Sequence, residues 1–166
     1  CFTLRIGVGG VIDATVPVVK RADVYSDIAV NLARGHGFVA EAGGEPIIWR
    51  APLYPAFLAA VYALFGEQNE TGVFLTQSAL DAVTAVLIFY LGTRLFGETV
   101  GLLSAVSFAV HPLSAYYSLR FLSEPLFTLA FTAVIAAWIA AVTTRRLMAY
   151  LAVGALIAVA ALVKPV

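Results

Sequence analysis

Long apolar stretches separated by short polar breaks dominate the second half of the chain. A helix needs about 20 mostly apolar residues to cross a bilayer, and four stretches meet or nearly meet this length. They are residues 71–96, 99–118, 122–142 and 147–166. The links at 97–98 and 143–146 are very short, so each joins antiparallel neighbours. The pattern therefore predicts four transmembrane helices.

Residues 22–34, ADVYSDIAVNLAR, have a helical period. Apolar side chains recur every four residues, at Val24, Ile28 and Leu32. The opposite face is polar and comprises Asp23, Asp27, Asn31 and Arg34. Gly35 follows at once and suits a left-handed helix end. The pattern predicts an amphipathic helix that lies along the outer membrane surface.

Two other apolar segments are too short to cross a bilayer. Residues 52–65 are apolar over about 14 positions, a length that fits an interfacial or re-entrant helix. Residues 1–12 fit the outer end of a truncated first transmembrane helix, with a surface strand or loop as the alternative.

These elements predict one partial transmembrane domain over residues 1–166. Residues 13–70 would form a first periplasmic loop with surface helices, and residues 71–166 would form the four membrane helices. The chain begins at Cys1 and stops just after an apolar run. We therefore expect it to be the N-terminal portion of a longer protein, with a C-terminal remainder missing.

Composition supports a membrane protein. Hydrophobic residues make up 61% of the 166 residues and charged residues only 12%, about half of the roughly 25% usual for soluble proteins. So few charges cannot cover a soluble surface, and so much apolar surface excludes disorder. Ten basic and ten acidic residues cancel, so no cationic surface points to nucleic acid. The fold class expected is an all-α, polytopic transmembrane bundle.

Cations in the short links predict the orientation in the membrane. Arg94 ends the first span, and Arg145 and Arg146 follow the third. These sites share one side if the spans alternate, and positive charge in short loops marks the cytoplasm. Residues 10–70 and 119–124 would then lie outside.

Acids at or inside a helical bundle are the informative residues of a membrane protein. Asp23 and Asp27 are four apart, so their carboxylates can converge as a general base or as oxygen ligands for a metal; the alternative is the wet face of a surface helix. Glu124 begins the third span beside Ser123 and Pro125, which fits a helix cap. Its carboxylate could equally lie at the outer mouth of the bundle.

Asp81 lies in mid-span, with Gln77 and Thr84 on the same face. An acid at this depth must face the bundle interior. It fits a buried inter-helix hydrogen bond, or a proton or ion carrier in a secondary transporter. No inverted repeat supports the transporter, and a non-catalytic membrane subunit is a third interpretation.

Cations at the outer ends of apolar segments are candidates for binding anions. Arg50 and Lys164 could meet a phosphate, pair with an acid, or extend to the membrane interface. His36 and His111 fit structural hydrogen bonds better than metal ligation. No phosphate loop, dinucleotide fingerprint, CxxC, HExxH or GxSxG motif occurs, so a charged substrate would be presented by the membrane itself.

The order of these features resembles the GT-C superfamily of integral-membrane glycosyltransferases. It is most similar to the bacterial branch of protein O-mannosyltransferases and lipid A aminoarabinose transferases. The matching segments are Asp23-x-Tyr25, IAVNLARGHGF at 28–38, RAPLYPAFLAAVYALFG at 50–66, Gln77-x-x-x-Asp81, RLFG at 94–97, LSEPLF at 122–127 and ALVKP at 161–165.

The resemblance implies transfer of a sugar from a polyprenyl-phosphate donor to a lipid, glycan or protein acceptor, at the periplasmic face of the bacterial inner membrane. It implies an acid in the first outer loop that acts on the acceptor, either Asp23 or Asp27, and a second acid at Glu124. The residues that it assigns to substrate binding are Tyr25, Arg50, Tyr54 and Lys164. Some members bind a divalent metal and others do not, so metal dependence stays open. Later helices should complete the site, so the fragment alone should be inactive.

Overall fold

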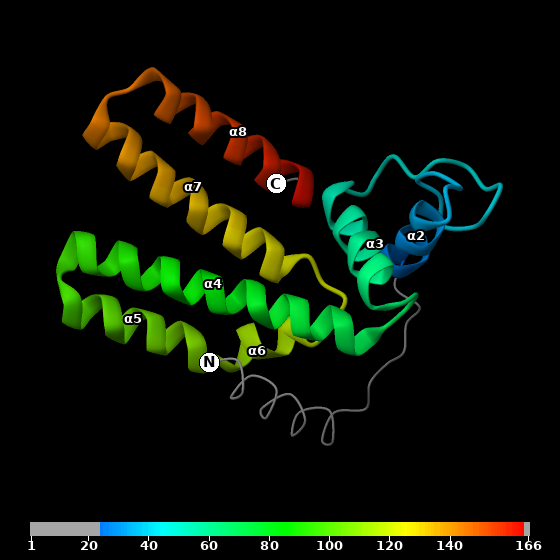
Figure 1. Ribbon diagram of the computed structural model, residues 1–166, viewed down its shortest axis with the longest axis horizontal. Coiled ribbons are helices and arrows are strands. Elements are labelled where there is room, and N and C mark those ends of the chain that lie inside the picture. Colours follow the sequence, from blue (N-terminus) through cyan, green and yellow to red (C-terminus); the bar gives the residue numbers. More distant parts are fainter. Residues whose placement is uncertain (1–23, 165–166) are drawn as a thin grey trace.

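The computed structural model describes residues 24–164, and all the regular structure within that range is helical. The helices are α2 (Val24–Ala33), α3 (Leu53–Phe65), α4 (Glu70–Phe96), α5 (Glu98–Val110), α6 (Pro112–Ser118), α7 (Glu124–Thr144) and α8 (Leu147–Val163) (Figure 1). The predicted all-α class is confirmed. The expectation for residues 1–12, and residue Asp23, lie outside the described residues.

Two antiparallel helical hairpins form the body of the protein. The α4–α5 and α7–α8 hairpins lie side by side, with α4 against α7 (Figure 1). Helices α2 and α3 pack together at one end of this body, where α3 also contacts α4 and α8. The outer segment expected from the sequence is therefore a helical cap on one end of the bundle.

Glycines allow the first hairpin to close tightly. Helix α4 ends at Phe96 and α5 starts at Glu98. The linking residue, Gly97, has a φ of 96°, which is accessible to glycine and strained for other residues. A Cβ atom on Gly92 would lie 2.6 Å from Gly101 Cα. The backbones of α4 and α5 are therefore in direct contact, as close packing between membrane helices requires.

The stretch 99–118, expected as one apolar span, is divided into α5 and α6 with a bend of 55°. Pro112 causes the break, because it has no N–H to donate and disfavours helical backbone at the preceding residue. Helices α4 and α7 are each long and apolar enough to cross a membrane, and the bent α5–α6 pair adds a third candidate. Helix α8 is apolar but shorter, and the four-span domain stays a prediction.

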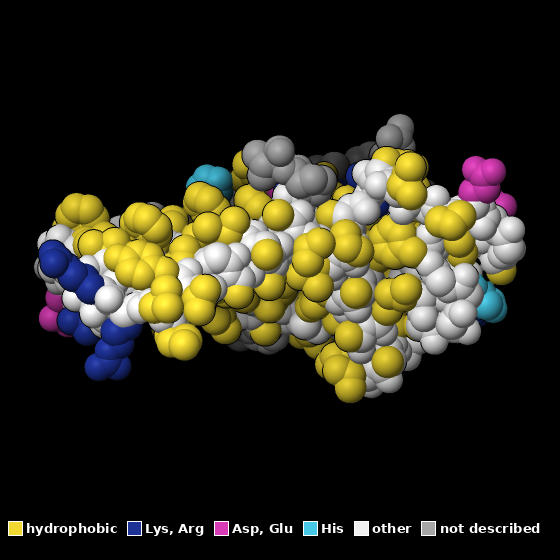
Figure 2. Space-filling view, turned by 90° about the horizontal axis from the view of Figure 1, so that it is seen from above, with side chains coloured by type: hydrophobic (Ala, Val, Ile, Leu, Met, Phe, Trp, Pro, Cys, Tyr) yellow, Lys and Arg dark blue, Asp and Glu magenta, His cyan; other side chains and the backbone are white. Residues whose placement is uncertain are grey.

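Charge and apolar surface are separated along the bundle. The α4–α5 turn carries Arg94 and Glu98, and the α7–α8 turn carries Arg145 and Arg146. Both turns lie at the same end, which is rich in basic side chains in Figure 2. Large apolar side chains are exposed along the helices between the ends, and examples are Val86, Leu103, Phe131, Trp138 and Leu151. This surface is suited to lipid.

Helix α2 buries its apolar face against protein. Ile28 and Ala29 are fully buried, and Ala29 packs with Tyr54 and Leu58 of α3. Asn31, which the period places on the polar face, is only 8% exposed. The following loop covers it, and its amide donates to the carbonyls of Val39 and Ala40. A local period cannot show that a later loop will fold back over a helix.

Candidate functional site

A cavity of about 350 Å³ lies at the end of the bundle opposite the arginine-rich turns. Four segments that are distant in sequence enclose it. The lining residues are Tyr25, Trp49, Arg50, Ala51, Leu122, Ser123, Glu124 and Lys164. The structure thus brings together Tyr25, Arg50, Glu124 and Lys164, four of the candidate site residues.

Aromatic rings hold the Arg50 guanidinium in the cavity wall. Its Cζ atom lies 4.7 Å from the ring centroids of both Tyr25 and Trp49, within the range of cation–π attraction. Arg50 Nη1 also donates to the Tyr25 hydroxyl at 3.1 Å. The buried Nε has no hydrogen-bond partner among the described residues. This wall therefore carries a fixed positive charge, and one N–H group of the guanidinium has no partner among the described residues.

Glu124 and Lys164 form the opposite wall of the cavity. Lys164 Nζ lies 3.1 Å from Glu124 Oε1, and the two side chains are 47% and 29% exposed. A pair this open is weakly held, so the ammonium can exchange partners. Glu124 Oε2 is buried without a hydrogen-bond partner among the described residues. The second wall thus offers a mobile cation and an acceptor oxygen.

Glu124 is the first residue of α7, as the capping interpretation expects. Ser123 occupies the cap position and Pro125 the first turn, but the Ser123 side chain makes no capping hydrogen bond. The carboxylate lies where the helix dipole favours negative charge. Glu124 can therefore stabilise the start of α7 and line the cavity at the same time.

Tyr54 lies behind the cavity and does not line it. The side chain is fully buried. Its ring meets the Tyr25 ring edge-on with centroids 5.1 Å apart, and its hydroxyl donates to Gln77 Oε1 at 2.9 Å. Tyr54 therefore supports Tyr25 from behind.

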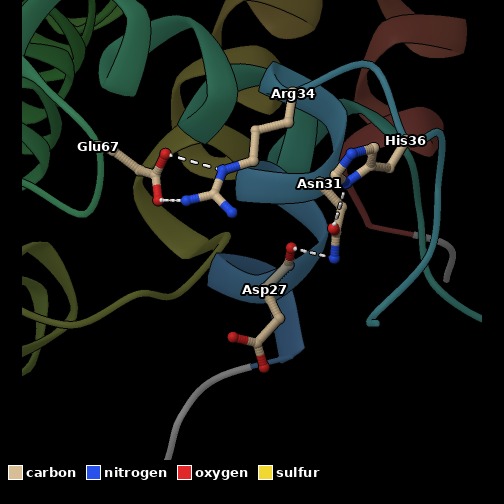
Figure 3. Close-up of polar contacts among 5 residues, drawn as sticks. All are labelled: Asp27, Asn31, Arg34, His36 and Glu67. Atoms are coloured by element: carbon tan, nitrogen blue, oxygen red, sulfur yellow. Dashed lines mark hydrogen bonds and ion pairs between the residues drawn. The ribbon is translucent and has the colours of Figure 1, made fainter. Parts of the chain in front are cut away.

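Asp27 lies in the first turn of α2 and is not among the lining residues. Its backbone carbonyl accepts from Asn31 Nδ2 at 3.1 Å, and its carboxylate points away from the other side chains drawn in Figure 3. Asn31 Oδ1 pairs with His36 Nδ1 at 3.1 Å. Arg34 pairs with Glu67 at 2.5 Å, away from the Asn31–His36 pair in Figure 3.

The histidines and Asp81 take part in structural hydrogen bonds. His111 caps α6, its Nδ1 accepting from the Ser114 N–H at 3.4 Å. Asp81 is 2% exposed and accepts a hydrogen bond from the Ser118 hydroxyl. The inter-helix hydrogen bond proposed for Asp81 is confirmed.

The described part of the chain offers no ligand set for a divalent metal. Within residues 24–164, no group of three or more His, Cys, Asp or Glu side chains could hold an ion. The cavity has one carboxylate beside two cations, which suits an anion rather than Mg²⁺ or Ca²⁺.

Sequence reasoning did not assign four of the lining residues to the site, namely Trp49, Ala51, Leu122 and Ser123. Trp49 carried a usable signal, since it directly precedes an arginine in an apolar chain and the two side chains can stack. Leu122 belongs to the LSEPLF segment, but a leucine in an apolar chain does not by itself indicate a cavity lining.

Comparisons with known proteins identify the family. No curated protein and no solved structure matches the chain. A family model, dolichyl-phosphate-mannose-protein mannosyltransferase, matches residues 49–166. The matched part contains Arg50, Glu124 and Lys164, and the resemblance seen in the motifs is confirmed. The chain therefore belongs to the dolichyl-phosphate-mannose-protein mannosyltransferase family, and it is a glycosyltransferase of the GT-C type.

Proposed function

We propose that the cavity binds the phosphate of a polyprenyl-phosphate sugar, and that the protein transfers this sugar to a lipid, glycan or protein acceptor. One observation carries the proposal: the cations of Arg50 and Lys164 share a cavity with the Glu124 carboxylate at one end of an apolar bundle. A lipid-linked donor would place its phosphate at this end and its prenyl chain along the apolar helices.

Arg50 and Lys164 would stabilise the departing phosphate. When the acceptor oxygen attacks the anomeric carbon, the bond from that carbon to the phosphate oxygen breaks and the phosphate gains negative charge. The Arg50 side chain lines the cavity, and charge-assisted hydrogen bonds from a guanidinium to phosphate are among the stronger ones. Fixed donors aimed at developing charge lower the barrier.

The acids would act on the acceptor. Asp23 or Asp27 takes the proton from the acceptor hydroxyl as it attacks, the usual task of a general base. The Glu124 carboxylate accepts a hydrogen bond from a hydroxyl of the sugar or the acceptor, while Lys164 moves from Glu124 toward the phosphate. The products are the glycosylated acceptor and a polyprenyl phosphate.

The difference between the two ends of the bundle supports one orientation in the membrane. Arg94, Arg145 and Arg146 lie in short turns at one end, and such residues favour the cytoplasmic side. The cavity lies at the opposite end and would open to the periplasmic face of a bacterial inner membrane.

The test follows sugar release from a labelled polyprenyl-phosphate sugar by the full-length protein in liposomes. The variants are Asp23→Asn, Asp27→Asn, Glu124→Gln and Lys164→Gln. One aspartate variant should lose at least about 100-fold in kcat, the scale of a general base, and Lys164→Gln should lose activity through the leaving phosphate. Arg34→Gln is the matched control for loss of a cation away from the cavity, and it should retain full activity.

Two results would contradict the proposal. One is a wild-type protein that neither binds nor consumes any polyprenyl-phosphate donor. The other is activity in Glu124→Gln and Lys164→Gln equal to that of Arg34→Gln, because the cavity would then not be the donor site.

A further inference from the structure

Gln77 lies in the middle of a hydrogen-bond network between the two walls of the cavity. It projects from α4, is fully buried and does not line the cavity. Its oxygen accepts from the Tyr54 hydroxyl at 2.9 Å. Its nitrogen donates to the carbonyls of Ser118 at 3.0 Å and Arg120 at 2.7 Å. One side chain therefore joins α3, α4, the last residue of α6 and the segment that follows it.

The oxygen side of Gln77 leads to the Arg50 wall. The Tyr54 ring packs edge-on against Tyr25 at 5.1 Å, and the Tyr25 hydroxyl accepts from Arg50 Nη1 at 3.1 Å. Any shift of Tyr54 is thus transmitted through Tyr25 to the guanidinium that faces the cavity.

The nitrogen side of Gln77 leads to the Glu124 wall. The Arg120 carbonyl that it holds also accepts from the Leu122 N–H at 2.8 Å. Leu122 and Ser123 line the cavity, and Glu124 follows as the first residue of α7. The amide of Gln77 therefore fixes the short segment that delivers the carboxylate.

Only a side chain with an acceptor and two donors can make all three bonds. The amide group of glutamine provides one acceptor oxygen and two N–H donors. The two carbonyl partners fix the orientation of this amide, because only its nitrogen can donate to them. Polar groups without partners are costly in an apolar bundle, so this network has one satisfied arrangement.

We propose that Gln77 is a positioning residue for glycosyl transfer, which holds the Arg50 wall and the Glu124 wall of the cavity at a fixed separation. This proposal rests on the function proposed above for the kinetic part of its test. Misplacing reacting groups by about 1 Å can cost about 100-fold in rate, so such a residue should affect catalysis without touching the substrate.

The first measurement needs no substrate. In a Cys1→Ser background, Ser123→Cys places a thiol on the segment held by Gln77, at a side chain only 5% exposed. Adding Gln77→Leu should raise its labelling rate by a small anionic methanethiosulfonate about 10-fold, because loss of these hydrogen bonds favours local opening. Ser78→Ala is the matched control, since Ser78 is the next residue of α4, is fully buried and its hydroxyl has no partner among the described residues.

The second measurement uses steady-state kinetics with a labelled polyprenyl-phosphate sugar. It distinguishes the oxygen-side contact of Gln77 from the nitrogen-side contacts. Tyr54→Phe removes the oxygen-side bond and keeps both amide donors of Gln77, and it should raise the donor KM about 3- to 10-fold with kcat nearly unchanged. Gln77→Glu keeps an acceptor for Tyr54 but loses the amide donor, and it should lower kcat about 10- to 100-fold. Ser78→Ala should leave both parameters at the wild-type values.

Three outcomes decide the matter. Equal labelling rates for Gln77→Leu and Ser78→Ala would overturn the positioning role. The positioning role would also be overturned if the activity of each variant fell only in proportion to its fraction of folded protein, with no separate effects on KM and kcat. If the wild type consumes no polyprenyl donor, the proposed function fails, but the labelling experiment still decides whether Gln77 holds the segment.

Discussion

At the residue scale, Arg50 shows how an apolar protein can hold a charged side chain in one orientation. The side chain is held between two aromatic faces, and one hydrogen bond to Tyr25 fixes the plane of the guanidinium. A lysine has a flexible stem and no planar fork, so it cannot copy this arrangement. The geometry of this residue, and not only its charge, should matter for the donor.

Arg50→Lys should therefore raise the donor KM about 10-fold while the protein stays folded. The measurement is the KM for a polyprenyl-phosphate sugar in liposomes. Arg34→Lys is the control, because Arg34 forms an exposed ion pair with Glu67 outside the cavity. A donor KM for Arg50→Lys equal to that control would mean that charge alone suffices.

The candidate site was predictable wherever a charge interrupts an apolar sequence. Charged side chains are costly in a membrane segment and usually have a function. This rule singles out Arg50, Glu124 and Lys164. Tyr54 and Gln77 were harder to place, because their contacts depend on which helices meet in three dimensions. The position of Asp27 outside the cavity lining depends on the rotation of α2, which a period of 3.6 residues leaves undetermined.

At the element scale, the helix boundaries followed the local chemistry closely. Gly97, Pro112 and Pro125 mark helix ends or starts through backbone rules that act within a few residues. The burial of α2 against α3 and the covering of Asn31 by the following loop were not predictable in the same way. They depend on contacts between segments, which hydropathy along one segment does not contain.

Gly101→Ala should destabilise the first hairpin. A Cβ atom there would lie 2.6 Å from Thr93 N and 2.7 Å from the Phe89 carbonyl oxygen, and backbone atoms cannot move aside. Overpacking of this kind costs about 1–3 kcal/mol, which should appear as a lower midpoint of thermal unfolding in detergent. Gly154→Ala is the control, since a Cβ atom there meets nothing within 4 Å. Equal midpoints for the two variants would show that α4 and α5 are not packed this closely.

At the scale of the whole molecule, two chemically different ends are separated by apolar helices. The cavity and the α2–α3 cap occupy one end, and the arginine-rich turns occupy the other (Figures 1 and 2). The proposed reaction needs this arrangement, because a lipid-linked donor must bring its phosphate to one membrane surface only.

A labelling experiment in intact bacterial cells checks this orientation. In a Cys1→Ser background, Glu41→Cys places a thiol in the exposed loop between α2 and α3, and Thr144→Cys places one at the exposed end of α7. A membrane-impermeant maleimide should label the first variant in intact cells and the second only after lysis. The reverse pattern would place the cavity at the cytoplasmic face.

The Asp81–Ser118 hydrogen bond also bears on how the protein enters the membrane. Asp81 receives this bond from a residue made 37 positions later, so α4 leaves the ribosome before this hydrogen-bond donor exists. Releasing α4 alone into lipid would deprive the Asp81 carboxylate of the Ser118 hydroxyl, and an acid at the centre of a membrane helix already costs about 2.5–3.5 kcal/mol. The insertion machinery should therefore retain α4 until α5 and α6 have been synthesised, so that the three helices move into the bilayer as one unit.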